Sequence, residues 1–181
     1  MTGGPSRTAL VVTADAAERV LAPWRRRHNR SAVEHRIPAH VTILFPLVPA
    51  AEVDEPLLAR LAELYARVEP FSFDLARLDS FPDAAWLHPE PAAPFHALID
   101  RTCAAFPDSP PYGNPSLAPV PHCTVGIAED PARLAAMMAE LQAGLAPLLP
   151  IRCEATAVSL LEERHDATWP LRARFPFRGV R

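Results

Sequence analysis

The chain has 181 residues, of which 49% are apolar, and its formal net charge at pH 7 is −3. That length suits one domain or two tightly packed lobes with a sizeable core. The small net charge excludes a broadly basic protein that coats nucleic acid, although both ends are basic: residues 1–36 carry seven Arg against three acids, and residues 164–181 carry five Arg against one.

All eighteen basic residues are arginine. A P-loop requires a lysine against the phosphates, and nucleotidyl transfer through a lysine adduct requires the amine itself, so both chemistries are excluded. The chain also lacks the GxGxxG motif of dinucleotide sites and the HExxH motif of helical zinc proteases. We therefore expect neither a cofactor nor a metal ion.

The N-terminal segment MTGGPSRT lacks the basic and apolar regions of a secretory signal, and no apolar run approaches the ~18 residues of a membrane span. We expect a cytoplasmic protein with no membrane and no obligate protein partner. The three cysteines, Cys103, Cys123 and Cys153, form no CxxC pair and are expected to be buried free thiols.

The first predicted elements are a strand over residues 8–15 and a helix that begins at Asp15 and Glu18, which resemble a capping box. The helix ends in an arginine run: Arg25, Arg26, Arg27 and Arg30. Two interpretations of this run stay open. It is either a solvated helix end favoured by the helix dipole or a local patch that steers a phosphate toward the protein.

The next predicted elements complete the first half of the chain. Residues 40–46 form a strand, and a helix follows from Asp54 until Pro70 stops it. Residues 71–78 alternate as a strand, and residues 84–90 are its expected partner across a turn.

The second half runs through the same series of elements. We predict a helix over 94–106, a strand over 120–128, a helix capped by Asp130, and strands over 151–158 and 168–177. The two strands that contain His40 and His122 are offset by 82 positions, and the later strands that start at Phe71 and Ile151 by 80. These offsets indicate two structural repeats.

The repeats predict an α+β fold: a bilobal, duplicated α/β arrangement in which two antiparallel-rich sheets face a central groove. We expect a single domain over residues 1–181, with pseudo-symmetric lobes at roughly 15–90 and 91–177.

Each repeat carries one His-x-Thr motif in a strand that begins just after a proline. Successive side chains of an extended chain lie on opposite faces, so His40 and Thr42 share one polar face. The apolar residues that alternate with them are expected on the other face: Val41, Ile43 and Phe45. The second motif, His122 and Thr124, has the same pattern, with Cys123 turned away.

If the repeats pack around an approximate two-fold axis, both motifs face one groove. Side chains two apart on a strand lie ~6.6 Å apart, so an imidazole and a hydroxyl can reach different oxygens of one tetrahedral anion. Because imidazoles change charge near neutral pH, one can start as a base and the other as an acid. The remaining histidines have no counterpart in the other repeat and are expected at the surface or in packing: His28, His35, His88, His96 and His165.

The motifs HVT at 40–42 and HCT at 122–124, in a duplicated α/β chain, make the sequence resemble the 2H phosphoesterase superfamily over nearly its whole length. The segments PWRRRH, AHVTILFP, APFHAL, PPYG and LRARFPF are similar to its 2′-5′ RNA ligase-like branch. The resemblance implies metal-independent hydrolysis of 2′,3′-cyclic or 2′-5′ phosphodiesters of nucleotides or RNA ends, with RNA ligation as the reverse reaction. One departure is Cys123, which stands where an aliphatic residue is more typical.

Carried over position by position, the resemblance makes His40 and His122 the acid and base and makes Thr42 and Thr124 the phosphate-binding residues. By analogy with the family, His122 is the preferred base and His40 the acid. Tyr112, in the loop before the second motif, is the preferred substrate-binding residue because its ring can stack on a nucleotide, although a structural turn is the alternative. Two other aromatic residues are expected only to pack: Phe45 and Trp86.

Two other classes of function remain open. A non-catalytic module could use the same groove to hold a nucleotide or an RNA end, and a structural partner protein would hold no anion there. Turnover of 2′,3′-cyclic nucleotides with and without a chelator separates the enzyme from the binding module.

Overall fold

Two four-stranded antiparallel sheets and five α-helices make up the computed structural model, which describes residues 6–180. The strands are β1 (Thr8–Thr13), β2 (His40–Leu44), β3 (Phe71–Phe81), β4 (Ala84–Glu90), β5 (Cys123–Ile127), β6 (Ile151–Ala155), β7 (Ala157–Glu162) and β8 (Leu171–Pro176). The helices are α1 (Asp15–His28), α2 (Arg30–Glu34), α3 (Glu55–Tyr65), α4 (Ala93–Ala105) and α5 (Pro131–Gly144). The predicted α+β class is confirmed, whereas residues 1–5 of the segment used to exclude a secretory signal lie outside the described residues.

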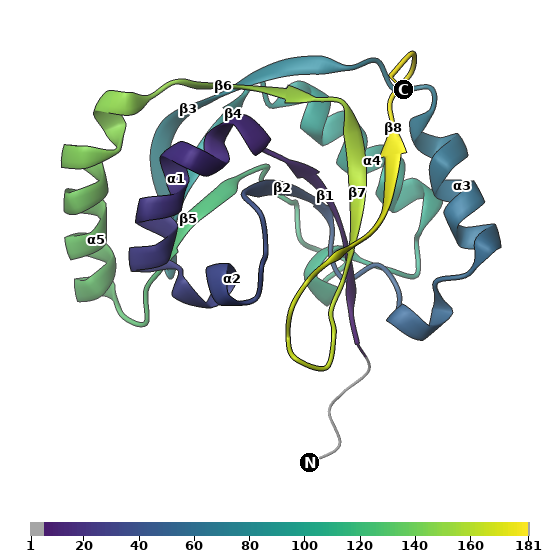
Figure 1. Ribbon diagram of the computed structural model, residues 1–181, viewed down its shortest axis with the longest axis horizontal. Helices are drawn as coiled ribbons and strands as arrows, with labels where there is room; N and C mark the ends of the chain where they lie inside the picture. Colours follow the sequence, from purple (N-terminus) through teal and green to yellow (C-terminus); the bar gives the residue numbers. More distant parts are fainter. Residues whose placement is uncertain (1–5, 181) are drawn as a thin grey trace.

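The two sheets have the strand orders β2-β1-β7-β8 and β5-β4-β3-β6 (Figure 1). Each sheet combines strands from both halves of the sequence, because β3 pairs with β6 and β4 with β5, while β7 pairs with β1 on one side and with β8 on the other. The two edge strands that carry the His-x-Thr motifs, β2 and β5, contact each other. The topology therefore brings the two motifs to the junction between the sheets.

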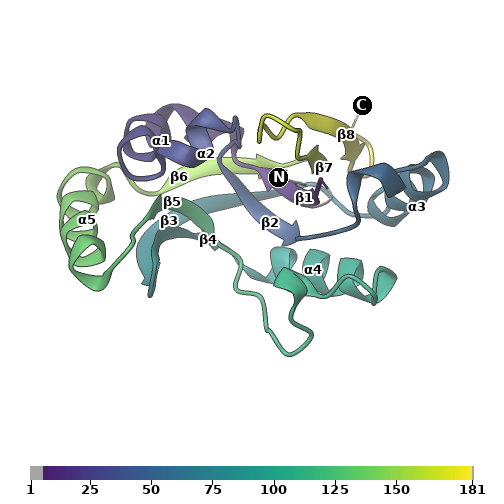
Figure 2. The same cartoon turned by 90° about the horizontal axis from the view of Figure 1, so that it is seen from below.

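Helices cover both sheets, and α1 and α4 each pack on the sheet to which the preceding strand does not belong. Helix α1 follows β1 of the first sheet but packs on β5 and β6 of the second, and α5 packs on β3 and β4. Helices α3 and α4 pack on β8 and β2, and Figures 1 and 2 show them at the end of the molecule opposite α5. One apolar cluster includes Val12 and Val41 of the first sheet and Leu75 and Val125 of the second, so the sheets share a core.

Two of the three predicted helix caps are confirmed, and α1 begins at Asp15 as predicted. Asp54 and Asp130 each accept a hydrogen bond from the backbone N–H three residues on, at 2.9 and 2.8 Å. The capping box predicted for α1 is wrong, because the N-cap residue is Ala14 and no side chain caps it. The Glu18 carboxylate instead accepts a bond from the backbone N–H of Ala39, at 2.7 Å, just before β2.

The strand predicted over residues 151–158 is wrong in one respect, because the chain leaves one sheet at Thr156 and enters the other. Strand β6 is a sheet edge with alternating burial, as the sequence pattern indicated, whereas β7 lies between β1 and β8 and five of its six residues are buried. Alternation from Ile151 was therefore a property of β6 alone. Within residues 6–180, no helix combines the length and hydropathy that crossing a bilayer requires.

Candidate active site

The His-x-Thr motif of β2 has the predicted two-faced pattern. His40 and Thr42 are half-buried, whereas Val41 and Ile43 are fully buried in the core. In the second motif, His122 directly precedes β5 and Thr124 lies within it, opposite Trp86 of β4.

Both imidazoles are held by the same hydrogen bond. Nδ1 of His40 donates to the carbonyl of Pro38, and Nδ1 of His122 donates to the carbonyl of Val120. Both N···O distances are 2.7 Å. A carbonyl can only accept, so Nδ1 carries the proton in the neutral ring and Nε2 keeps a free lone pair. Each ring is thus prepared to take or give a proton at Nε2.

Burial lowers the pKa of both imidazoles below the ordinary value of 6.5. For His40 the pKa falls to about 4, since burial outweighs the bond to Pro38, and the positive charges of Arg25 and His122 lower it further. The two rings stand at the starts of strands β2 and β5, which contact each other. A negative ligand beside either ring would raise the pKa of that ring.

Aromatic rings surround His122. The Phe81 ring meets it edge-on with centroids 4.9 Å apart, and the Trp86 ring lies at 5.8 Å. Trp86 is 3% exposed, so it packs as predicted. His88, expected at the surface or in packing, is next to Trp86 in β4 and donates from Nε2 to Asp79 over 2.9 Å, which lowers the pKa of that carboxyl group.

A pocket of about 180 Å³ lies beside His40 and Thr42. Its other lining residues are Ala9, Val11, Ile37, Phe45, Tyr112, Leu161 and Trp169. The prediction that Phe45 shares the core face of Val41 and Ile43 is wrong: β2 ends at Leu44, and Phe45 packs instead on the small cluster that includes Trp169, with ring centroids 5.9 Å apart.

Tyr112 reaches this pocket from the loop that follows α4. Its backbone N–H donates to the carbonyl of Phe45 at 2.6 Å, and its side chain lines the same pocket as Thr42. Tyr112 has φ 53°, a left-handed conformation that non-glycine residues seldom adopt. The structure thus places the predicted substrate-binding residue against the first motif.

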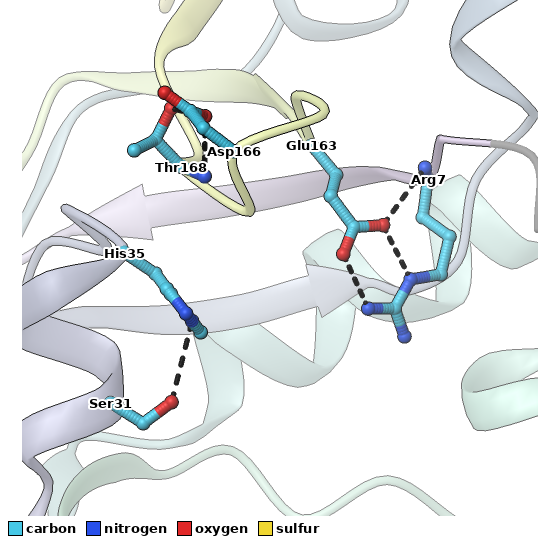
Figure 3. Close-up of polar contacts among 6 residues, drawn as sticks. All are labelled: Arg7, Ser31, His35, Glu163, Asp166 and Thr168. Atoms are coloured by element: carbon cyan, nitrogen blue, oxygen red, sulfur yellow. Dashed lines mark hydrogen bonds and ion pairs between the residues drawn. The ribbon is translucent and has the colours of Figure 1, made fainter. Parts of the chain in front are cut away.

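The pocket rim was missed by sequence reasoning. Arg7 forms two 2.8 Å bonds to Glu163 (Figure 3). Its guanidinium lies over the rings of Phe45 and Trp169, at 5.4 and 5.6 Å from their centroids. The loop between β7 and β8 brings Trp169 into the pocket, and the backbone N–H of Trp169 donates to the backbone carbonyl of His35. Only tertiary contacts connect these residues, so no local pattern could reveal them.

The arginines of the run at the end of α1 differ in their exposure to solvent. Arg26, Arg27 and Arg30 are exposed, as either interpretation of the run requires. Arg25 is 2% exposed, so the expectation that it lies in solvent with the others is wrong. It forms an ion pair with Glu18 behind β2.

Within residues 6–180, no group of three or more His, Cys, Asp or Glu side chains is arranged to hold a metal ion. The three cysteines are free, but Cys103 is only half-buried, so the prediction of three buried thiols is wrong for it. Cys123 is fully buried on the core side of β5, and burial raises the pKa of its thiol to about 12. The departure from the family pattern at Cys123 therefore lies away from the His-x-Thr face.

Comparison with known proteins gives one family match. The family model described as the 2′-5′ RNA ligase superfamily matches residues 13–167. No curated protein sequence matches the chain at a significant level.

Several solved structures have the same fold. Escherichia coli LigT complexed with 3′-AMP has a TM-score of 0.63 at 15% identity, over 96% of this chain and 99% of LigT. LigT complexed with NADP⁺ gives 0.59 at 16% identity, over 97% and 99%. A protein of Thermus thermophilus gives 0.59 at 17% identity, over 97% and 100%. Identities this low establish the fold alone.

Proposed function

Because this chain belongs to the 2′-5′ RNA ligase superfamily of 2H phosphoesterases, we propose that it is a metal-independent phosphodiesterase of a single two-lobed domain. Its proposed substrates are 2′,3′-cyclic or 2′-5′ phosphodiesters of nucleotides or RNA ends in the cytoplasm. The observation that supports this most is the pair of His-x-Thr motifs on contacting edge strands, where His40 and His122 have identical Nδ1 hydrogen bonds.

In the proposed reaction, one imidazole Nε2 removes a proton from water, which attacks the phosphorus in line. The other imidazole protonates the ribose oxygen that leaves, so the phosphodiester bond breaks without a metal ion. The hydroxyls of Thr42 and Thr124 donate to the nonbridging oxygens as negative charge develops there. Ligation of RNA would be the reverse of this reaction.

The electrostatics of the two rings suggest which is the base. Analogy with the family favoured His122. However, burial and the charge of Arg25 keep the pKa of His40 near 4, and a base must be neutral at the start of the reaction. We therefore propose His40 as the base and His122 as the acid.

The pocket beside His40 is proposed to hold the nucleotide ring. Its walls are almost entirely apolar and include the rings of Phe45, Tyr112 and Trp169, which suit stacking against a base. Ligands named for LigT, 3′-AMP and NADP⁺, support a nucleotide as the ligand of this fold.

The test is turnover of 2′,3′-cyclic AMP and of a 2′-5′-linked diadenylate, each with and without EDTA. We expect hydrolysis at the same rate under both conditions. Loss of turnover in EDTA would overturn the metal-independent mechanism. Binding of both compounds without turnover would instead support the non-catalytic binding module.

A further inference from the structure

A buried guanidinium lies directly behind the backbone that leads to His40. Arg25 donates from Nη1 to both oxygens of Glu18, at 3.0 and 3.2 Å, and from Nη2 to the carbonyl of Ile37, at 2.6 Å. Its Nε has no hydrogen-bond partner among the described residues. Burying a charge costs free energy even when the charge is paired, so this buried ion pair contributes little net free energy to the stability of the fold.

The ion pair acts on the peptide unit between Pro38 and Ala39. The carbonyl of this peptide unit, from Pro38, accepts the hydrogen bond from Nδ1 of His40. The N–H of the same unit, from Ala39, donates to Oε2 of Glu18 at 2.7 Å. A peptide unit is planar and rigid, so the carboxylate that fixes the N–H also fixes the direction of the carbonyl on its other side. Arg25 in turn fixes the carboxylate and the preceding carbonyl of Ile37.

We infer that Arg25 and Glu18 are positioning residues for His40, holding the peptide unit that orients its ring and selects its Nδ1–H tautomer. Neither residue touches the reacting atoms. The effect expected on rate rests on the proposed function, whereas the effect on the tautomer does not.

Other groups also face His40, and they define what a test must separate. Arg25 and His122 lower its pKa, while Glu18 and the Pro38 carbonyl raise it. The buried thiol of Cys123, on β5, lies near the His40 backbone, which lowers the pKa of that thiol slightly against the larger effect of burial. Replacing Glu18 by Gln removes a charge that raises the pKa of His40 and also loosens the bond to Pro38, so both changes lower that pKa. Replacing Arg25 has opposing effects on it, so the tautomer is the better readout there.

The experiment compares Arg25→Met, Arg25→Lys and Glu18→Gln with Arg19→Met, an exposed position on the same helix. The ¹⁵N shifts of the His40 ring, assigned by comparison with His40→Asn, report its tautomer. Arg25→Met should lose the Nδ1–H preference and lower kcat ~100-fold on 2′,3′-cyclic AMP, with KM changed less than threefold. Arg25→Lys should restore part of both, and Arg19→Met should match the unmodified protein.

The outcomes separate this inference from the proposed function. If the unmodified protein does not turn over any phosphodiester, the proposed function fails, but the ring tautomer still tests the positioning. If Arg25→Met keeps both the tautomer and kcat, the positioning role is overturned. Should Arg25→Met fail to fold, Glu18→Gln decides, because its side chain is 44% exposed. Loss of the Nδ1–H preference of the His40 ring in that variant supports the inference, and an unchanged tautomer overturns it.

Discussion

The two histidine motifs share one hydrogen bond but are supported in different ways. The peptide unit before His40 is held by Glu18 and Arg25, and Ala39 is 2% exposed. Val120, whose carbonyl binds His122, is 47% exposed, and among residues 6–180 no side chain hydrogen-bonds to the backbone of 118–121 apart from His122 itself. The His122 ring is instead flanked by aromatic rings. An ion pair thus supports the first motif and aromatic packing supports the second.

This difference shows that a duplicated motif does not require duplicated surroundings. What recurs is the bond that leaves Nε2 free, while the environment of each ring differs in charge and burial. Because acid and base need different pKa values, unequal surroundings are what a reaction with two distinct proton-transfer roles requires.

The largest expected effect is the loss of either imidazole. His40→Ala and His122→Ala should each lower kcat by ~10²- to 10⁴-fold, because each removes one proton-transfer group. The rate of cyclic phosphate hydrolysis measures this, and His96→Ala, exposed on α4, is the matched control. If one variant keeps activity within tenfold of the unmodified protein, the two-histidine mechanism is wrong.

The pH profile should show the inequality between the rings directly. With His40 as base, kcat/KM should fall on the acid side near pH 4, where His40 gains a proton. With His122 as acid, it should fall on the alkaline side below pH 6.5, since burial lowers the pKa of that ring. On each side of the optimum, kcat/KM should fall ~10-fold per pH unit. A plateau that extends through pH 8 would contradict the lowered pKa of His122.

Local signals predicted much of the fold. The His-x-Thr alternation and the capping aspartates Asp54 and Asp130 depend on neighbours within a few residues, and the structure has them as expected. The division of residues 151–162 between two sheets depends on which strands lie on either side, which alternation does not encode.

In the candidate site too, local sequence signals predicted some residues, whereas others depend on tertiary contacts. Its four motif residues could be picked out because their spacing repeats along the chain. Arg25 looked like one member of a solvent-facing run, and its burial depends on Glu18 and on the backbone before β2. Trp169 had no sequence signal at all, since the loop between β7 and β8 carries it to a pocket formed by distant strands.

Phe81 tests the aromatic support of His122. An edge-to-face aromatic contact contributes ~0.5–1.5 kcal/mol, so Phe81→Leu should lower kcat by up to ~10-fold. This is less than the effect expected for Arg25→Met. The matched control is Phe71→Leu in the same strand, where the ring packs on Phe95 rather than on a histidine. If Phe81→Leu lowers kcat as much as Arg25→Met does, aromatic packing positions the His122 ring as strongly as the ion pair positions the His40 ring.

The smallest effect is expected at Tyr112, which the sequence left open between a substrate contact and a structural turn. Tyr112→Phe removes the hydroxyl from the pocket that Thr42 also lines but keeps the ring, and one hydrogen bond from such a hydroxyl contributes ~0.5–1.5 kcal/mol. We therefore expect kcat to fall a few-fold while KM for 2′,3′-cyclic AMP stays constant. Tyr112→Leu removes the ring as well, and stacking against a base predicts that KM rises. Unchanged KM in the leucine variant would make Tyr112 a support for Thr42 and leave the base to the rings of Phe45 and Trp169.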